Sequence, residues 1–179
     1  MNNLAISSWK GVFIIKTKLI ILRGNSGSGK TTIAKRLQNH FGEGTLLVSQ
    51  DTVRREMLMV RDREGNISQD LIKQITEYGK GKCKFVILEG IFVKQRYKAM
   101  LEDLIHFYEG NAYIYYFDLS FENTVARHNS RPQAEEFGED LLRFWWSPDD
   151  QLGLAEEKLL TEEMTQKDIL NLICIQLAV

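Results

Sequence analysis

Apolar residues in this chain follow two alternating patterns. In the first they form short continuous runs, which predict strands buried on both faces. In the second they recur every three or four positions, which predicts helices with one buried face. The predicted strands comprise residues 18–22, 45–49, 84–88, 112–117 and 158–160. The predicted helices comprise residues 30–41, 51–63, 68–78, 94–108, 121–130 and 165–176.

The alternation of strands and helices predicts an α/β fold, in which a doubly wound parallel sheet lies between two layers of helices. Residues 1–179 are expected to form one domain, because a second core would be cramped in this length. Residues 1–17 precede the first predicted strand, and we expect them to add a strand or a hairpin. Residues 132–147 are expected to form a small helical lid.

Composition narrows the class of protein. The chain is 44% hydrophobic and 26% charged, as expected of a soluble domain with a core. No apolar run approaches the roughly 18 residues of a membrane span, and the first residues do not resemble a signal peptide. We therefore expect a cytoplasmic protein with no membrane partner. The two cysteines and three histidines show no disulfide or metal spacing.

Charge is unevenly distributed along the chain. Residues 1–131 carry 20 basic and 13 acidic side chains, whereas residues 132–179 carry 3 and 11. A positive body suits ligands that carry phosphate, although solvated helix faces and an acidic C-terminal helix account for these counts equally well.

The connection between the first predicted strand and the first predicted helix carries the clearest chemical signal. It fits G-x-x-x-x-G-K-[ST], the P-loop or Walker A pattern. Its glycines let successive backbone N–H groups turn toward an anion, and the helix start adds further N–H groups. Lys30 would reach the β- and γ-phosphates of ATP, while the Thr31 hydroxyl would complete the shell of a Mg²⁺ ion. The residues predicted to bind ATP are Gly24, Asn25, Ser26, Gly27, Ser28, Gly29, Lys30, Thr31 and Thr32.

Two segments that follow the P-loop carry a resemblance to a known family. They are Ser49-Gln50-Asp51-Thr52-Val53-Arg54 and Val86-Ile87-Leu88-Glu89-Gly90. This order resembles the P-loop kinases of the P-loop nucleoside triphosphate hydrolase superfamily. The Asp-x-x-Arg spacing is similar to that of polynucleotide kinases, chloramphenicol phosphotransferase and zeta toxins, and Leu88-Glu89-Gly90-Ile91 is similar to uridine kinase. The resemblance implies a nucleoside-kinase-like fold that uses ATP and Mg²⁺.

The resemblance also implies roles for charged residues outside the P-loop. An aspartate at the position of Asp51 accepts the proton of the attacking hydroxyl, and Arg54 would hold the acceptor; a surface ion pair between the two is the alternative. Glu89 ends a buried strand, where its carboxylate would bind Mg²⁺, the acceptor hydroxyl or a neighbouring loop. Arg127 and Arg131 would stabilise the transferring phosphate as catalytic residues, or would lie exposed at a helix end.

The lid candidate contains Phe144-Trp145-Trp146. These aromatic residues would either close over a ligand or attach the lid to the body. We expect them to pack, because the apolar Leu141 and Leu142 lie beside them in the sequence.

Two functions fit these observations. The first is an ATP-dependent kinase that transfers the γ-phosphate to a hydroxyl of a small molecule, a nucleoside or a polynucleotide end. The alternative is a nucleotide-binding switch or an ATPase with no such acceptor, because the same loop serves those proteins. Asp62-Arg63-Glu64-Gly65 fits the D-x-x-G of GTPases, but no predicted strand ends in it and the chain contains no [NT]-K-x-D to read guanine. The kinase is therefore the favoured hypothesis, and fold analogy does not choose its acceptor.

Overall fold

The computed structural model describes residues 15–129 and 138–179. Five strands form one sheet in the order β2-β3-β1-β4-β5, and all neighbouring pairs are parallel. The strands are β1 (Lys18–Gly24), β2 (Leu46–Ser49), β3 (Phe85–Gly90), β4 (Ala112–Asp118) and β5 (Glu157–Thr161). The helices are α1 (Lys30–Phe41), η1 (Thr52–Met57), α2 (Ser68–Gly79), α3 (Lys94–Phe107), α4 (Phe121–Asn129), α5 (Glu139–Trp145) and α6 (Gln166–Leu177).

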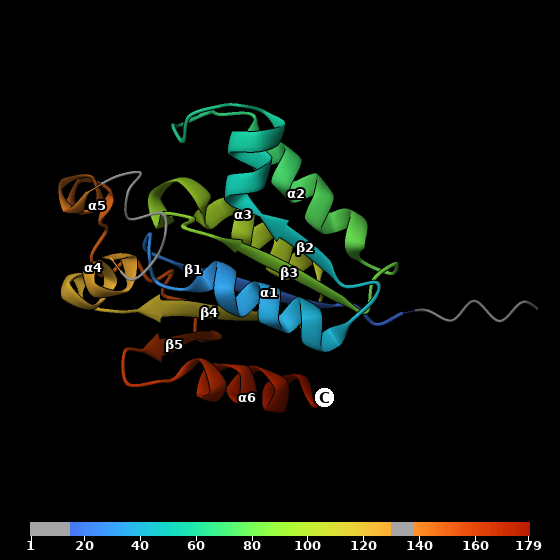
Figure 1. The fold of residues 1–179 in the computed structure, drawn as a ribbon. Helices are drawn as coiled ribbons and strands as arrows, with labels where there is room; N and C mark the ends of the chain where they lie inside the picture. The colour runs from blue at the N-terminus through green and yellow to red at the C-terminus, as the bar shows by residue number, and fades with distance from the viewer. Residues whose placement is uncertain (1–14, 130–137) are drawn as a thin grey trace, which may run out of the picture.

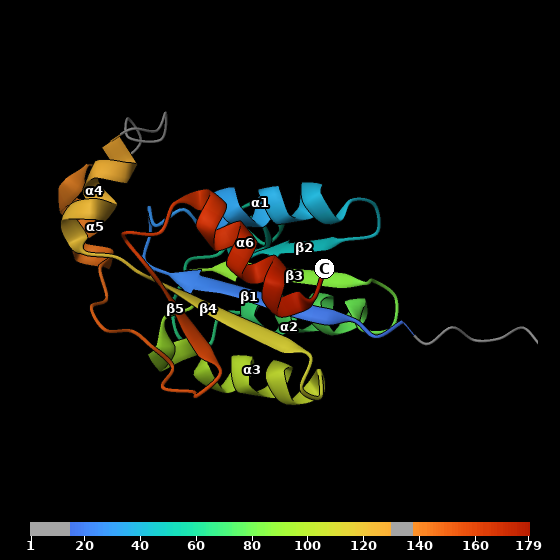
Figure 2. The same cartoon turned by 90° about the horizontal axis from the view of Figure 1, so that it is seen from below.

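Helices cover both faces of the sheet, which confirms the predicted doubly wound α/β fold. Helices α1 and α6 lie on one face and α2 and α3 on the other (Figure 2). Alternate residues of β1 supply the two cores: Ile20 and Leu22 pack toward α1 and α6, whereas Leu19 and Ile21 pack toward α2 and α3. No helix in the described part of the chain is long and apolar enough to cross a membrane.

The predicted helix over residues 51–63 is wrong beyond its first half. The chain forms the short π-helix η1, which ends when the Leu58 N–H donates to the Val53 carbonyl five residues earlier. Met59 then adopts φ +53°, a left-handed conformation that takes the chain out of the helix. The spacing of apolar residues does not reveal that the helix ends here, because Val60 continues the helical pattern of apolar positions.

The ends of the chain and the lid candidate are only partly described. Of the predicted N-terminal extension, residues 15–17 form no regular element and the rest lies outside the described residues. Within the lid candidate, residues 139–145 form the helix α5, which the apolar pattern did not resolve as a separate element. In Figure 1, α4 and α5 lie beyond the ends of β1 and β4 toward which the arrows point.

A charged side chain, Arg23, lies wholly buried at the end of β1. Its guanidinium is paired with Asp150 at 2.7 Å and with Glu157, at the start of β5, at 2.8 Å. It also donates to the carbonyl of Phe92, in the turn after β3, at 3.0 Å. A buried cation needs such partners because water is excluded from it. Arg23 thereby fixes three segments distant in sequence to the end of β1.

We expect Arg23→Met to lower the free energy of unfolding by about 3–5 kcal/mol, because it leaves the buried carboxylates of Asp150 and Glu157 without a counter-charge. The change is measured by urea denaturation, with Arg36→Met on the exposed surface of α1 as the matched control. The control should change stability by no more than about 0.5 kcal/mol. Equal effects of the two substitutions would contradict the role assigned to Arg23.

Candidate functional site

The glycine-rich loop lies between β1 and α1, at the carboxyl edge of the sheet (Figure 1). Gly24, at its start, has φ +142°, and a Cβ there would lie 3.0 Å from both the Cβ and the carbonyl oxygen of Phe117 on β4. Only glycine fits this conformation and this close approach. The first glycine of the motif therefore places the loop directly against β4.

Lys30 opens α1 and lies folded over the loop. Its side chain is buried, and Nζ donates to the Asn25 carbonyl oxygen at 2.7 Å and to the Ser28 hydroxyl at 3.2 Å. The helix begins after Gly29 with no side-chain cap, so the N–H groups of its first turn face the loop without a capping side chain. A cationic side chain and a helix N-terminus thus converge where a phosphate would bind.

Glu89 joins the P-loop helix to the end of β2. Its buried carboxylate accepts hydrogen bonds from the Ser49 hydroxyl at 2.6 Å and the Thr31 hydroxyl at 3.1 Å. The structure therefore brings together Thr31 and Glu89, the two residues predicted to hold metal. These oxygen atoms are the ligand type that Mg²⁺ prefers, and Mg²⁺ usually takes only one or two protein ligands beside water and phosphate. Sequence reasoning missed Ser49, although it belongs to the segment that carried the kinase resemblance.

Asp51 and Arg54 lie just after β2 and form an ion pair. Arg54 Nη2 lies 2.8 Å from Asp51 Oδ1, and Arg55 Nε lies 3.2 Å from the same oxygen. The Asp51 side chain is 54% exposed, so its carboxylate is open to an incoming molecule. Arg54 is more buried, and its Nε has no acceptor among the described residues. The ion pair that the sequence offered as the alternative is therefore present, and the exposed Asp51 carboxylate is also accessible to an acceptor.

Arg127 extends from α4 to the far side of the P-loop. Its Nη1 donates to the Ser28 carbonyl oxygen at 3.0 Å, which places the guanidinium beside the loop. Arg131, its predicted partner in catalysis, lies outside the described residues.

A cavity of about 390 Å³ opens between Arg127, the start of α1 and the connection from β5 to α6. The P-loop contributes Ser28, Gly29 and Thr32, the β5–α6 connection contributes Met164 and Thr165, and α6 contributes its first residue, Gln166. No carboxylate lines the cavity among the described residues. Its positive and apolar walls suit a nucleotide base with phosphates attached. Residues 164–166 carry no motif, so sequence reasoning could not assign them to this site.

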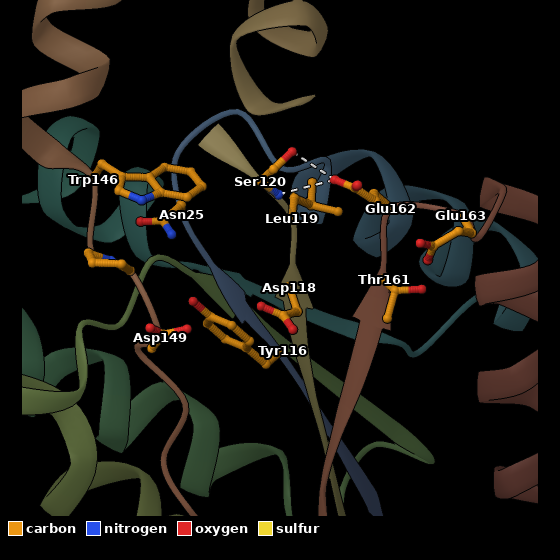
Figure 3. A pocket seen from close by; sticks show the side chains of 11 residues that line it. Asn25, Tyr116, Asp118, Leu119, Ser120, Trp146, Asp149, Thr161, Glu162 and Glu163 are labelled. Carbon is orange, nitrogen blue, oxygen red and sulfur yellow. Dashed lines mark hydrogen bonds between the residues drawn. The ribbon is translucent and has the colours of Figure 1, made fainter. Parts of the chain in front are cut away.

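A second cavity, of about 440 Å³, lies beside Asn25 (Figure 3). Figure 3 shows that its wall combines the rings of Tyr116 and Trp146 with carboxylates. Four residues supply these carboxylates, namely Asp118, Asp149, Glu162 and Glu163. The Ser120 hydroxyl, then its backbone N–H, donate to Glu162 and lower the pKa of that carboxyl. Because like charges repel, this cavity disfavours a polyphosphate, whereas the first cavity has no carboxylate among its described lining residues.

Helix α4 and the end of α5 are attached to each other by aromatic contacts. Trp146 packs edge-on against Phe121 with ring centroids 5.3 Å apart, and the Arg143 guanidinium lies 4.1 Å from the centroid of the same ring. Phe144, in contrast, is 82% exposed. The expectation that these aromatic residues pack therefore describes Trp146 and is wrong for Phe144, because α5 is a single short helix with one covered face.

The sheet order and the loop after β1 define the class: a P-loop protein with the three-layer fold of small kinases. A sequence model described as an AAA domain matches residues 19–143, well over half of the chain. The chain belongs to this AAA-domain family. Among curated proteins, none matches the chain.

Solved structures similar to the chain include three kinases. A gluconokinase from Sinorhizobium meliloti is 15% identical, with a TM-score of 0.65 over 90% of this chain and 91% of that one. The APS kinase of Mycobacterium tuberculosis, in complex with AMPPNP and APS, is 15% identical, with a TM-score of 0.63 over 91% and 98%. Shikimate kinase from Acinetobacter baumannii, in complex with shikimate, is 18% identical, with a TM-score of 0.61 over 92% and 96%. At these identities the likeness establishes the fold alone.

We expect Gly24→Ala to destabilise the protein more than Gly44→Ala does. Both glycines have positive φ, but an added Cβ meets nothing within 4 Å at Gly44, whereas it meets Phe117 at Gly24. The control should cost about 1–2 kcal/mol of unfolding free energy, the penalty of a left-handed residue, and Gly24→Ala should exceed it. Urea denaturation of both variants measures the difference. Equal losses would show that the loop does not depend on its approach to β4.

Proposed function

We propose that the protein is an ATP-dependent kinase that transfers the γ-phosphate to a hydroxyl group of an acceptor. The observation that carries this proposal is the convergence of Lys30, Thr31 and Glu89 at one edge of the sheet, with the open carboxylate of Asp51 beside β2. The fold supports it, because the gluconokinase and the shikimate kinase share that fold. We further propose that residues 1–179 form a single cytoplasmic kinase domain, with its lid within residues 132–147.

The nucleotide is proposed to lie along the start of α1. Its base enters the cavity between Arg127 and residues 164–166, and its phosphates follow the P-loop N–H groups toward Lys30. Lys30 and Arg127 approach the phosphates from opposite sides of the loop. Together they supply the positive charge that stabilises the transferring phosphoryl group.

Thr31 and Glu89 are proposed to hold Mg²⁺ at the end of the P-loop. The ion, when bound, neutralises charge on the β- and γ-phosphates. Glu89 is suited to this place because its carboxylate already lies 3.1 Å from the Thr31 hydroxyl and is oriented by Ser49. We therefore assign Glu89 to the metal side of the site and leave the acceptor to Asp51 and Arg54.

Asp51 is proposed to orient the acceptor hydroxyl and to take its proton as the hydroxyl oxygen attacks the γ-phosphorus. The bond to the β,γ-bridging oxygen breaks, and ADP leaves. Arg54 neutralises the Asp51 carboxylate and contacts the acceptor through the guanidinium edge that faces Asp51.

The competing switch hypothesis finds no support in the geometry of its motif. Asp62, the aspartate of the D-x-x-G pattern, accepts hydrogen bonds from Tyr97 at 2.7 Å and Arg96 at 2.9 Å, both on α3. Burial and the hydrogen bond to Asp62 raise the pKa of Tyr97 and keep its hydroxyl protonated as a donor. Asp62 thus holds a loop to α3, a structural use of the motif.

The proposal is tested by measuring ADP release from ATP and Mg²⁺ with purified protein across a panel of acceptors. The panel contains sugars and sugar acids, nucleosides, UDP-sugars, aminoglycosides and 5′-hydroxyl oligonucleotides, with an acceptor-free control. We expect ADP release to depend on one class of acceptor and that acceptor to gain one phosphate by mass. Hydrolysis indifferent to every acceptor would favour the switch or ATPase instead.

We expect Lys30→Ala and Asp51→Asn both to stop transfer, but by different routes. Lys30→Ala should weaken ATP binding about 10- to 100-fold, because a charged hydrogen bond to phosphate is lost. Asp51→Asn should leave ATP affinity unchanged and lower kcat about 100- to 10,000-fold, because the proton acceptor is lost. Fluorescent-nucleotide titration and steady-state kinetics measure the two effects. The controls are Lys35→Ala and Asp70→Asn, both exposed on helices; full turnover in Asp51→Asn would remove the base assignment.

A further inference from the structure

Asn25, the second residue of the P-loop motif, uses its side chain away from the loop interior. Its Nδ2 donates to the Ser147 carbonyl oxygen at 2.9 Å, and its Oδ1 accepts from the Ser147 backbone N–H at 2.9 Å. The Asn25 side chain therefore pairs with both backbone groups of one residue, as a strand would. A side-chain amide suits this pairing because it carries its donor and its acceptor on two adjacent atoms. The residue is 5% exposed, so water does not replace these bonds.

Ser147 begins a short segment that crosses from the P-loop to the acceptor side of the sheet. We name residues 147–150 the strap. At its other end, Asp150 accepts from Arg23 at 2.7 Å, and both of its oxygens lie 3.0 Å from the backbone nitrogen of Lys94, the first residue of α3. The side chain before α3, Val93, provides no cap, so Asp150 supplies one from the strap. Burial raises the pKa of Asp150, although the hydrogen bonds from Lys94 and Arg23 act in the opposite direction.

The strap also reaches the lysine of the motif through Asn25. The carbonyl oxygen that accepts from Lys30 Nζ belongs to Asn25 itself. The Asn25 carbonyl oxygen therefore positions the Nζ end of the Lys30 side chain. The Asn25 side chain, through Ser147, in turn positions the backbone that carries this carbonyl. On the other side of the loop, α4 is attached through Arg127 and Ser28. The α4–α5 unit is thus fastened to the P-loop at Ser28 and at Asn25.

We infer that Asn25 is a positioning residue for phosphoryl transfer, which acts through the backbone of Ser147 and not by binding the nucleotide with its side chain. This inference rests on the proposed function. Without the Asn25–Ser147 pair, the loop carbonyl that orients Lys30 loses its support, and the strap loses its attachment to the phosphate side. A displacement of about 1 Å at a transferring group is enough to lower its rate 100-fold. The effect belongs to the rate of transfer more than to nucleotide affinity, which many loop N–H groups share.

The test uses four variants of the full chain: Asn25→Ala, Ser147→Pro, the double variant and Ser147→Ala. Ser147→Pro removes the N–H that donates to Asn25, and Trp146 already has the extended conformation, φ −68° and ψ 126°, that a following proline requires. Ser147→Ala is the matched control, because only the backbone of Ser147 contacts Asn25. Turnover is counted per nucleotide-binding site, so that an unfolded fraction does not register as a loss of kcat.

We expect Asn25→Ala and Ser147→Pro each to lower kcat about tenfold, with a smaller change in the Kd for a fluorescent ATP analogue. The double variant should be no slower than the singles, because both remove the same contact. Ser147→Ala should have the kcat and the Kd of the wild type. Hydrogen exchange, which needs no acceptor, should show faster exchange of the Ser147 amide in Asn25→Ala, and also of the Lys94 amide at the far end of the strap.

If the wild-type enzyme turns over and Asn25→Ala has the same kcat, this inference is overturned and the proposed function stands. Additive losses in the double variant would also overturn it, because Asn25 would then act independently of Ser147. A wild-type protein that phosphorylates no acceptor would overturn the proposed function and this role together. If Asn25→Ala fails to fold, Ser147→Pro with normal kcat per site would overturn the inference by itself.

Discussion

The guanidinium of Arg23 is the interaction on which the arrangement of the site depends. It is wholly buried, it directly precedes the first glycine of the P-loop, and its partners come from β5, from the strap and from the turn after β3. A buried cation does not tolerate the loss of its carboxylates, so these segments cannot drift from the end of β1. The position of the P-loop, the return of the chain from α5 and the start of α3 are fixed by one charge.

The carboxyl edge of the sheet is divided by charge. On the α1 side of Asn25, the helix N-terminus, Lys30 and Arg127 create a positive surface without carboxylates among the residues lining the cavity. On the other side, four carboxylates line the second cavity. A polyanion is therefore attracted to the first cavity and repelled from the second, so a bound polyphosphate has one favoured orientation along the loop. Three of these four carboxylates, those of Asp149, Glu162 and Glu163, belong to the acidic C-terminal part of the chain.

The sequence predicted what depends on local pattern and missed what depends on distant pairing. All five strands and the P-loop followed from apolar runs and glycine spacing, and Thr31 and Glu89, each considered as a Mg²⁺ ligand from the sequence, lie within hydrogen-bond distance of each other. The exit from η1 at Met59 was missed because its left-handed backbone leaves no mark in the apolar pattern. Arg23 directly follows the first predicted strand, but its two carboxylate partners lie more than 120 residues later in the chain. Asn25 pairs through its side chain with the backbone of Ser147. Any residue with a backbone N–H at position 147 could form this pair, so the residue type there does not predict it.

The cavity beside the P-loop takes one wall from the loop itself and another from Met164, Thr165 and Gln166, at the start of α6. Because synthesis proceeds from the N-terminus, a P-loop formed early lacks this second wall until residues 164–166 have also left the ribosome. A ligand that binds only the complete site stabilises only chains in which that site is complete. A nucleotide bound here, as proposed, would therefore stabilise chains that already contain the start of α6 and would give no support to shorter ones.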